Sequence, residues 1–470
     1  MGTARVGRTR RAAEAAGAFL RGAAGRASIG VAAAVAAVVA AVAPGCEPTA
    51  RDPRPVLLYG ADNQGVLAAC GCPSNPTGGL AKRQGLIEQY RRTRSHVLVV
   101  DAGNVMPDRS SPVKVKYLAQ ALARARYDAI GLGDQEFLLG ADRLRDLARQ
   151  HELPLVCANV RDAAGELVAA PNVVCEVQDV RVGIFSVIAD RAWGFPVREW
   201  RTGLTVESPV DAARRQVALL AECDVVVALL HMTMLEAGDL LPLVPGIDVA
   251  IVGHAHEVLR KPDRIGETMV LSPGEAGHIL GSLTVERDEP GGQLNLVPEL
   301  TVLSAQIPDA PWVMDLYWKY VDESKDKPPP DWDLTPIPPR YETAEACKEC
   351  HENEYKQWLT TKHAQGYESI KKAGRHQDPE CVLCHTMGLG RKGGFVSMAK
   401  TPGLGRVTCQ ACHVVTSDHD EKGVKIDSEI TISSRLCMSC HGPVQSPDFD
   451  YFVYKPKILH TSAAEKRTVE

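Results

Sequence analysis

Apolar residues between positions 55 and 304 alternate between two patterns. Short β-branched runs at 97–100 and 225–230 have the length and composition of buried strands, and 113–125 has the spacing of a helix face. Because strands and helices alternate, we expect an α/β fold. Further strands are predicted at 56–59, 128–132, 181–187, 248–252, 281–285 and 294–303, and further helices at 79–92, 141–150 and near 211–221.

The apolar pattern changes after residue 305. Residues 309–324 show helical periodicity, and the proline-rich stretch that follows predicts a stiff linker. Residues 341–470 contain few long apolar periods, which predicts a mostly helical and irregular region. We therefore divide the chain into residues 1–46, 47–305, 306–340 and 341–470.

The N-terminus combines arginines with an Ala/Val run at 28–42, which predicts an export signal. The run is shorter than the ~20 residues that a spanning helix needs. Gly45-Cys46 resembles the end of a bacterial lipobox, although Ala43 and Pro44 match it poorly. Lipidation of Cys46, which would anchor the chain to a membrane, stays open.

Net charge excludes one class of partner. The formal net charge is −5, with acidic and basic residues mixed along the chain. A basic surface for nucleic acid is therefore not expected.

The C-terminal region repeats the pattern C-x-x-C-H four times. In this pattern two thiols bond a haem covalently and the adjacent imidazole becomes the proximal iron ligand. Structural zinc or disulfides would not require a histidine after every second cysteine. We expect four c-type haems on Cys347, Cys350, Cys381, Cys384, Cys409, Cys412, Cys437 and Cys440, with proximal ligands His351, His385, His413 and His441.

Residues 341–470 hold eight histidines, so four remain after the proximal ligands are assigned. These are enough to give every iron two imidazoles, an arrangement that favours reversible electron transfer. His376, in a polar stretch, equally fits a surface residue. The distal candidates are His363, His376, His419 and His460.

This tail resembles the cytochrome c554 family. The resemblance rests on Trp358 and His363-Ala364 after the first motif, and on Thr386 and Gly388 after the second. It departs at the third motif, where Val-Val follows His413 and the family often has Gly-Pro. The pairing of irons with distal ligands therefore does not follow from the resemblance.

The middle of the chain resembles the 5′-nucleotidase branch of the calcineurin-like metallophosphoesterases. The resemblance implies an αββα four-layer sandwich with two divalent metals at the strand ends. It rests on polar residues that follow successive predicted strands, namely Asp62-Asn-Gln64, Asp101-Ala-Gly-Asn104, Gly133-Asp134-Gln135-Glu136, Ala158-Asn159, His231 and Gly253-His254-Ala-His256.

Three substitutions separate this chain from that family's pattern. Gln64 stands where the family has a metal-binding His, and Asn104 where it has the bridging Asp. An Asn carbonyl lacks the charge needed to bridge two cations. Gln135 replaces a His that assists the leaving oxygen, and Gln cannot shuttle a proton near neutral pH.

We therefore expect a reduced metal site. Asp134, His231 and His254 would converge with Asn104, a set suited to one iron, manganese or zinc ion. Asp62 and His256 remain beside this position. One metal, two metals or none stay open as alternatives.

Cys70-Gly-Cys72 follows Asp62 and is expected near the same cleft. It is a candidate catalytic thiol pair, a soft metal ligand set or part of structural disulfides. Cys157, Cys175 and Cys223 are also unassigned.

Three functions compete on these residues. The first is an electron carrier of the bacterial periplasm or cell envelope that serves redox partner proteins. The second is a redox enzyme that acts on a small oxyanion or sulfur compound through one metal or through Cys70 and Cys72. The third is a metal-dependent phosphoester hydrolase, against which Gln64, Asn104 and Gln135 argue.

Overall fold

The computed structural model describes residues 51–69, 77–107, 111–193, 203–255, 257–287, 289, 292–325, 340–413, 419, 433–442, 445–446 and 448–460. By internal contacts, Arg51–Glu470 form one unit, distinct from Met1–Ala50. The predicted export signal with Cys46, the Cys70 and Cys72 pair, His256 and the proline-rich linker lie outside the described residues.

The first sheet has the order β14-β13-β1-β2-β3-β4. Its strands β1 to β4 run parallel, and β13 pairs antiparallel with β1 and with β14. The strands are β1 (Val56–Gly60), β2 (Val97–Asp101), β3 (Ala129–Gly131), β4 (Leu155–Val156), β13 (Ile279–Arg287) and β14 (Leu294–Val302).

The second sheet has the order β11-β12-β10-β9-β7-β6. Strands β7, β9, β10 and β12 are parallel, and β6 and β11 close the edges in the antiparallel sense. The strands are β6 (Asn172–Val177), β7 (Val180–Ile188), β9 (Val225–His231), β10 (Val249–Gly253), β11 (Asp263–Ile265) and β12 (Thr268–Leu271), with a separate pair β5 (Val160–Arg161) and β8 (Thr205–Val206).

The two sheets bury their facing side chains against one another. Leu57 and Tyr59 of β1 belong to the same core cluster as Val227 and Leu229 of β9. The alternate residue Leu58 belongs to the other large cluster, which also contains helix residues such as Leu118. Side chains that point to opposite faces of one strand therefore fill two separate cores.

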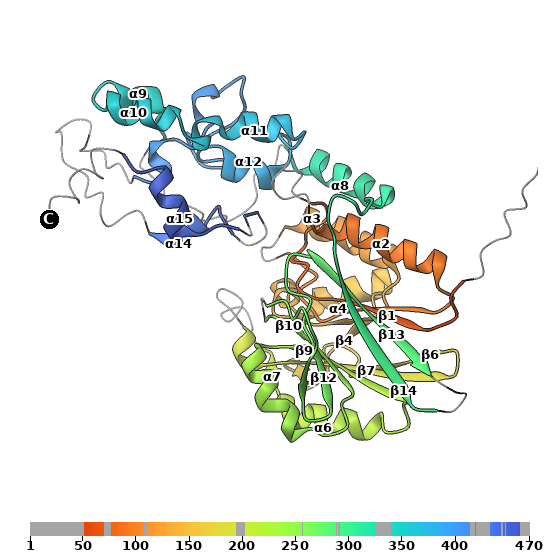
Figure 1. The fold of residues 1–470 in the computed structure, drawn as a ribbon. Coiled ribbons are helices and arrows are strands. Elements are labelled where there is room, and N and C mark those ends of the chain that lie inside the picture. The colour runs from red at the N-terminus through yellow and green to blue at the C-terminus, as the bar shows by residue number, and fades with distance from the viewer. Residues whose placement is uncertain are drawn as a thin grey trace, which may run out of the picture. The chain divides into compact units, whose positions relative to one another are not determined.

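Helices cover the outer faces of the sheets (Figure 1). In one layer α8 packs against α2 and α3, and in the other α6 packs against β7. The predicted αββα sandwich is thus confirmed. The helices are α2 (Gly79–Thr93), α3 (Pro112–Ala125), α4 (Ala141–His151), α6 (Pro209–Leu219), α7 (Met234–Leu240) and α8 (Pro311–Ser324), with short 3₁₀ helices η1 (Gln135–Leu139), η2 (Asp190–Ala192) and η3 (Leu241–Leu243).

The region after residue 340 is built from short helices around two small apolar clusters. One cluster centres on Ile370 and Phe395, and the other on Trp358 and Ala364. This agrees with the predicted helical and irregular region. The elements are α9 (Ala344–Lys348), α10 (Glu352–Leu359), η4 (Lys362–Gln365), α11 (Gly366–Lys372), α12 (Pro379–His385), η5 (Pro402–Leu404), η6 (Cys409–Ala411), α14 (Ser434–Met438), α15 (Tyr451–Tyr454) and η7 (Lys455–Lys457).

Among the described residues, no helix has both the length and the apolar character needed to cross a membrane.

Candidate metal centre and haem motifs

Strand register brings the predicted metal ligands together. His231 ends β9 and pairs with Gly253 of β10, so His254 follows at the next position. Asp134 lies beyond the end of β3, in the other sheet. One ligand atom from each of these three side chains lies within 4.8 Å of the other two. The ends of the parallel strands therefore form a site with two imidazoles and one carboxylate.

The orientation of His231 is fixed by the backbone. Its Nδ1 lies 3.1 Å from the Ala102 carbonyl oxygen, which can only accept a hydrogen bond. Nδ1 therefore carries the proton, and Nε2 faces the Asp134 Oδ1 at 3.4 Å. A lone pair facing a carboxylate oxygen is repulsive unless a proton or a cation lies between them. This arrangement fits a metal ion that is bound by both groups.

Burial and charge oppose one another at this pair. Burial alone would raise the pKa of Asp134, but the hydrogen bond and charge of His231 hold that pKa below its usual value. Burial likewise opposes protonation of His231, yet its hydrogen bond to Asp134 raises the pKa of His231. In the protonated form of His231, the two groups therefore form a buried ion pair.

Asn104 contacts the site without being placed as a metal ligand. Its Nδ2 donates to Asp134 Oδ1 at 3.0 Å, and its Oδ1 accepts from the Gln135 backbone N–H at 3.0 Å. Both ends of the amide are thus engaged in protein hydrogen bonds. Asn104 therefore orients the Asp134 carboxylate.

Asp62 and Gln64 also lie close to this site but make other contacts. The Asp62 Oδ2 accepts a hydrogen bond from the His254 backbone N–H at 2.6 Å. The Gln64 side chain donates through Nε2 to Glu275 at 3.2 Å. Asp62 therefore holds the loop that carries His254, while His256 is outside the described residues.

Glu136 and Gly133 shape the site but were not among the predicted site residues. The buried Glu136 carboxylate accepts hydrogen bonds from the backbone N–H groups of Gly133, Asn104 and Met106, at 2.7, 3.0 and 2.9 Å. Burial raises the pKa of Glu136, and the Met106, Gly133 and Asn104 hydrogen bonds oppose that rise. A Cβ at Gly133 would lie 2.2 Å from Asn104 Oδ1. Gly133 and Glu136 lie within two residues of Asp134, and this proximity was the sequence signal that could have identified them.

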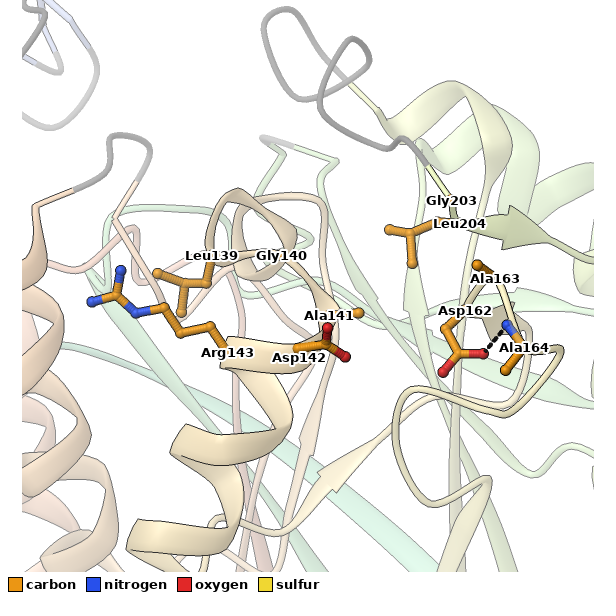
Figure 2. A pocket seen from close by; sticks show the side chains of 10 residues that line it. All are labelled: Leu139, Gly140, Ala141, Asp142, Arg143, Asp162, Ala163, Ala164, Gly203 and Leu204. Atoms are coloured by element: carbon orange, nitrogen blue, oxygen red, sulfur yellow. Dashed lines mark hydrogen bonds between the residues drawn. The ribbon is translucent and has the colours of Figure 1, made fainter.

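A shallow pocket begins where η1 ends (Figure 2). Within it, Asp162 accepts a hydrogen bond from the Ala164 backbone N–H at 2.9 Å and forms an ion pair with Arg145. None of its lining residues belongs to the metal set. The lining comprises Leu139, Gly140, Ala141, Asp142, Arg143, Asp162, Ala163, Ala164, Gly203 and Leu204.

Each C-x-x-C-H motif forms a single tight turn. In three motifs the histidine N–H donates to the carbonyl of the first cysteine, as in His351 to Cys347 at 3.0 Å, His413 to Cys409 and His441 to Cys437. In the other, both cysteines and His385 lie on α12. This turn brings the two thiols and the imidazole onto one side, as covalent haem attachment requires.

Three proximal imidazoles face a second imidazole. The ring centres are 6.0 Å apart for His351 and His419, 6.2 Å for His413 and His460, and 6.1 Å for His441 and His363. An imidazole nitrogen bonds a metal at about 2 Å, so two imidazoles on opposite sides of one iron have centres roughly 6 Å apart. These three pairs therefore fit bis-imidazole haems.

His376 is placed differently from the other distal candidates. It lies edge-on to Tyr367, with ring centres 6.1 Å apart, and is not placed opposite a proximal imidazole. His385 donates from Nδ1 to the Gly366 carbonyl at 3.0 Å, which directs its Nε2 away from the backbone. Burial lowers the pKa of His385 and so favours the neutral, ligating form.

The described fold and site define a phosphoesterase-like sandwich joined to a region of haem motifs. Residues 346–414 match the family described as cytochrome c554 and c-prime. Cytochrome c-554 of Nitrosomonas europaea is 33% identical over 88 residues, which cover 16% of this chain and 37% of that protein. The predicted resemblance of the tail is confirmed.

The middle of the chain is similar to nucleotidases. Bovine 5′-nucleotidase is 26% identical over 277 residues, covering 52% of this chain and 47% of the relative. The sulfate thiohydrolase SoxB of Thermus thermophilus shares the fold, with a TM-score of 0.50 and 18% identity over 59% of this chain and 62% of that one. The chain thus spans about half or less of each curated relative named here.

Proposed function

We propose that this chain is an exported electron-transfer protein that carries four c-type haems in residues 341–470. The three imidazole pairs at 6.0 to 6.2 Å are the observation that supports this function most directly. Two imidazoles on one iron leave no open coordination position, which suits electron transfer and not substrate binding. The cytochrome c554 match supports haem electron transfer for this region.

We assign the distal ligands from the same distances. His419, His460 and His363 bind the irons of His351, His413 and His441, respectively. The iron of His385 receives no second imidazole from the described residues. Three haems are then six-coordinate and the fourth has a different ligand field.

Electron paramagnetic resonance of the oxidised full-length protein tests this assignment. We expect low-spin signals from three bis-imidazole haems and a distinct signal from the fourth. His419→Ala, His460→Ala and His363→Ala should each remove one low-spin signal. His376→Ala is the matched control and should remove none. Loss of a low-spin signal in the His376 variant would show that the pairing is wrong.

The location and partners of the protein belong to the same proposal. The C-x-x-C-H motifs and the predicted export signal together support a location of the mature protein in the bacterial periplasm or cell envelope, where it would exchange electrons with redox partner proteins. Lipidation of Cys46 would tether it to a membrane. Metabolic labelling with a radioactive fatty acid, compared between wild type and Cys46→Ser, tests the tether.

A second function is favoured by Asp134, His231 and His254. Their two imidazoles and one carboxylate suit one iron, manganese or zinc ion, which when bound would supply Lewis-acid or redox chemistry. With such an ion, or with the Cys70 and Cys72 thiols, the chain would be a redox enzyme for a small oxyanion or sulfur compound. The chain's own residues would hold the ion at Nε2 of His231 and orient Asp134 through Asn104.

Metal analysis of the full-length protein tests the site directly. After incubation with zinc or manganese, which are distinct from haem iron, we expect about one added ion per chain. The double variant His231→Ala/His254→Ala should lose it. Phosphatase activity that required His231 would instead favour the hydrolase. A redox activity lost in Cys70→Ser would favour the thiol pair.

A further inference from the structure

Helix α12, which carries the Cys381-x-x-Cys384-His385 motif, is fastened to helix α8 of the phosphoesterase-like region. The Tyr317 hydroxyl on α8 donates to the Oδ2 of Asp378 at 2.5 Å. The other oxygen of Asp378 caps α12 by accepting from the Glu380 N–H at 3.0 Å. Tyr317 and Asp378 are both buried, at 4% and 6% exposure. One carboxylate therefore holds the haem motif and receives the hydrogen bond from the neighbouring region.

Arg375 reinforces this junction from a second direction. Its guanidinium lies over the Tyr317 ring, 4.4 Å from the ring centre. Its Nη2 also donates to the Ala69 carbonyl at 2.8 Å. Ala69 belongs to the segment that leaves the metal cleft after Asp62. Arg375 thus contacts both α8 and a segment connected to the candidate metal centre.

Glu380 adds further contacts between the same two regions. It accepts a hydrogen bond from Tyr320 of α8 at 3.1 Å and forms an ion pair with Lys114 of α3 at 2.6 Å. The Lys114 side chain is 8% exposed. These contacts come from residues 375–380, immediately before Cys381. The haem attached there would therefore be held directly against the phosphoesterase-like region.

Buried charges of this kind fix one arrangement more than they add stability. Removing a buried charge from water is costly, and the cost is offset only in the geometry where all partners meet. Asp378 and Arg375 lie close in sequence to Cys381, whose N–H donates to the Asp378 carbonyl at 3.1 Å. Fixed charges beside a haem change its reduction potential, because the ferric form carries one more positive charge than the ferrous form.

We propose that Arg375, Asp378 and Tyr317 are positioning residues that dock the haem of Cys381 and Cys384 on the phosphoesterase-like region and set its reduction potential. This inference rests on the proposed electron-transfer function. A carboxylate at 378 favours the ferric state, and a guanidinium at 375 favours the ferrous state.

Spectroelectrochemical titration of the full-length holoprotein tests the proposal, because substitutions of Asp378 and Arg375 should shift the reduction potential of one haem in opposite directions. Asp378→Asn removes a negative charge and should shift one of the haem components to a more positive potential. Arg375→Gln removes a positive charge and should shift the same component to a more negative potential. Tyr317→Phe is a milder change, which leaves the Asp378 charge without its hydrogen-bond donor. It should also shift the reduction potential of the same haem component to a more negative value.

Matched controls on the exposed face of α8 separate this effect from a general change of charge. Asp315→Asn and Lys319→Gln should leave every component in place, since both side chains are exposed to water. His385→Met identifies the component, because a Met ligand raises the potential of the haem that bears it. Asp378→Asn and Tyr317→Phe together keep the test usable if Arg375→Gln fails to accumulate.

The outcomes distinguish this inference from the proposed function. If wild type shows no reversible haem component, the electron-transfer function itself fails. If wild type titrates but the variants shift no component, shift all components, or shift the same one in a single direction, the positioning role is wrong and the function stands. Opposite shifts of the component identified by His385→Met support the docking and the assignment together.

Discussion

Four residues of the metal cleft have a left-handed backbone, which non-glycine residues seldom adopt. Asp62, Gln64, Asn104 and His254 have φ values of 45°, 52°, 55° and 59°. Such conformations cost energy and persist only where the surroundings fix them. The sequence predicted these polar positions from their place after strands. It could not predict their backbone angles, because those depend on contacts such as that of Asp62 with the His254 N–H.

Adding a Cβ atom at Gly133 tests the candidate metal site in the cleft. A Cβ there would lie 2.2 Å from Asn104 Oδ1 and 2.5 Å from His231 Cε1, so Gly133→Ala must displace a side chain that orients or binds the metal. We expect the variant to bind zinc at least tenfold more weakly, measured by competition with a chromophoric chelator. Gly238→Ala on α7, where a Cβ meets nothing within 4 Å, is the control. Unchanged affinity in Gly133→Ala would show that the cluster is not the metal site.

The buried thiol of Cys157 and the half-buried thiol of Cys175 should be unreactive. Burial raises the pKa of Cys157 and of Cys175 to about 11. Only the thiolate reacts, so at pH 8 roughly one thiol in a thousand is in the reactive form. We expect mass spectrometry after iodoacetamide treatment to find Cys157 unmodified in the folded protein and alkylated after unfolding. Rapid alkylation of folded protein at Cys157 would contradict this burial.

Most elements of the sandwich could be predicted from the apolar pattern, whereas several short or outer strands could not. β1, β2, β9 and β10 begin and end within one residue of the predicted positions, because buried central strands are continuous apolar runs. The expectations missed β4, β5, β6, β8, β11 and β12, and the short helix α7. In β6 the buried, half-buried and exposed positions do not alternate regularly, so the apolar pattern of the sequence gives only a weak strand signal there.

The haem motifs were predictable as elements, but their pairing was not. Four C-x-x-C-H patterns are local signals, while His419 and His460 reach their partners through long-range folding. The ring distances of His363, His419 and His460 from a proximal imidazole are the basis of the pairing that we propose. His376 was the weakest of the four distal candidates in the sequence, and it lies beside Tyr367, whose ring packs into the small core around Phe395.

His460 makes a testable contact with Gln357 of α10. The His460 Nδ1 donates to the Gln357 Oε1 at 3.0 Å, which leaves Nε2 free to bind the iron that we propose for His413. In Gln357→Leu this orientation is lost, and we expect the haem of His413 to exchange its distal ligand more readily. Carbon monoxide should then bind one additional ferrous haem, and the shift of the Soret absorption band measures this binding.

The control for this substitution is Gln365→Leu, which removes an exposed amide at the end of η4. It should leave carbon monoxide binding as in wild type. Equal binding in both variants would mean that Gln357 does not support His460 as a distal ligand.

At the scale of the whole molecule, the sequence predicted two kinds of region but not how they meet. Helix α8 was expected to begin a linker, yet it packs on α2 and α3 and bonds to residues beside the second haem motif. The contact between Arg375 and Ala69 joins residues 306 positions apart. Such a partner cannot be identified from local pattern, since many arginines would fit the same description.

At the candidate metal centre, Gln64 and Asn104 differ from the residues that the metallophosphoesterase resemblance implies. Asn104 and Gln64 predicted a reduced site, and in the structure both side chains make protein hydrogen bonds. Among the described residues, Asp134, His231 and His254 lie close enough together that they could hold one ion. The haems provide the larger part of the chemistry that we propose.

Intact-mass spectrometry of the exported full-length protein tests the central proposal most directly. Expressed in a bacterium that matures c-type cytochromes, the chain should carry the mass of four covalent haems after denaturation. Replacing both cysteines of any one motif by serine should leave three. A wild-type mass without covalent haem, or with fewer than four, would contradict the tetrahaem assignment.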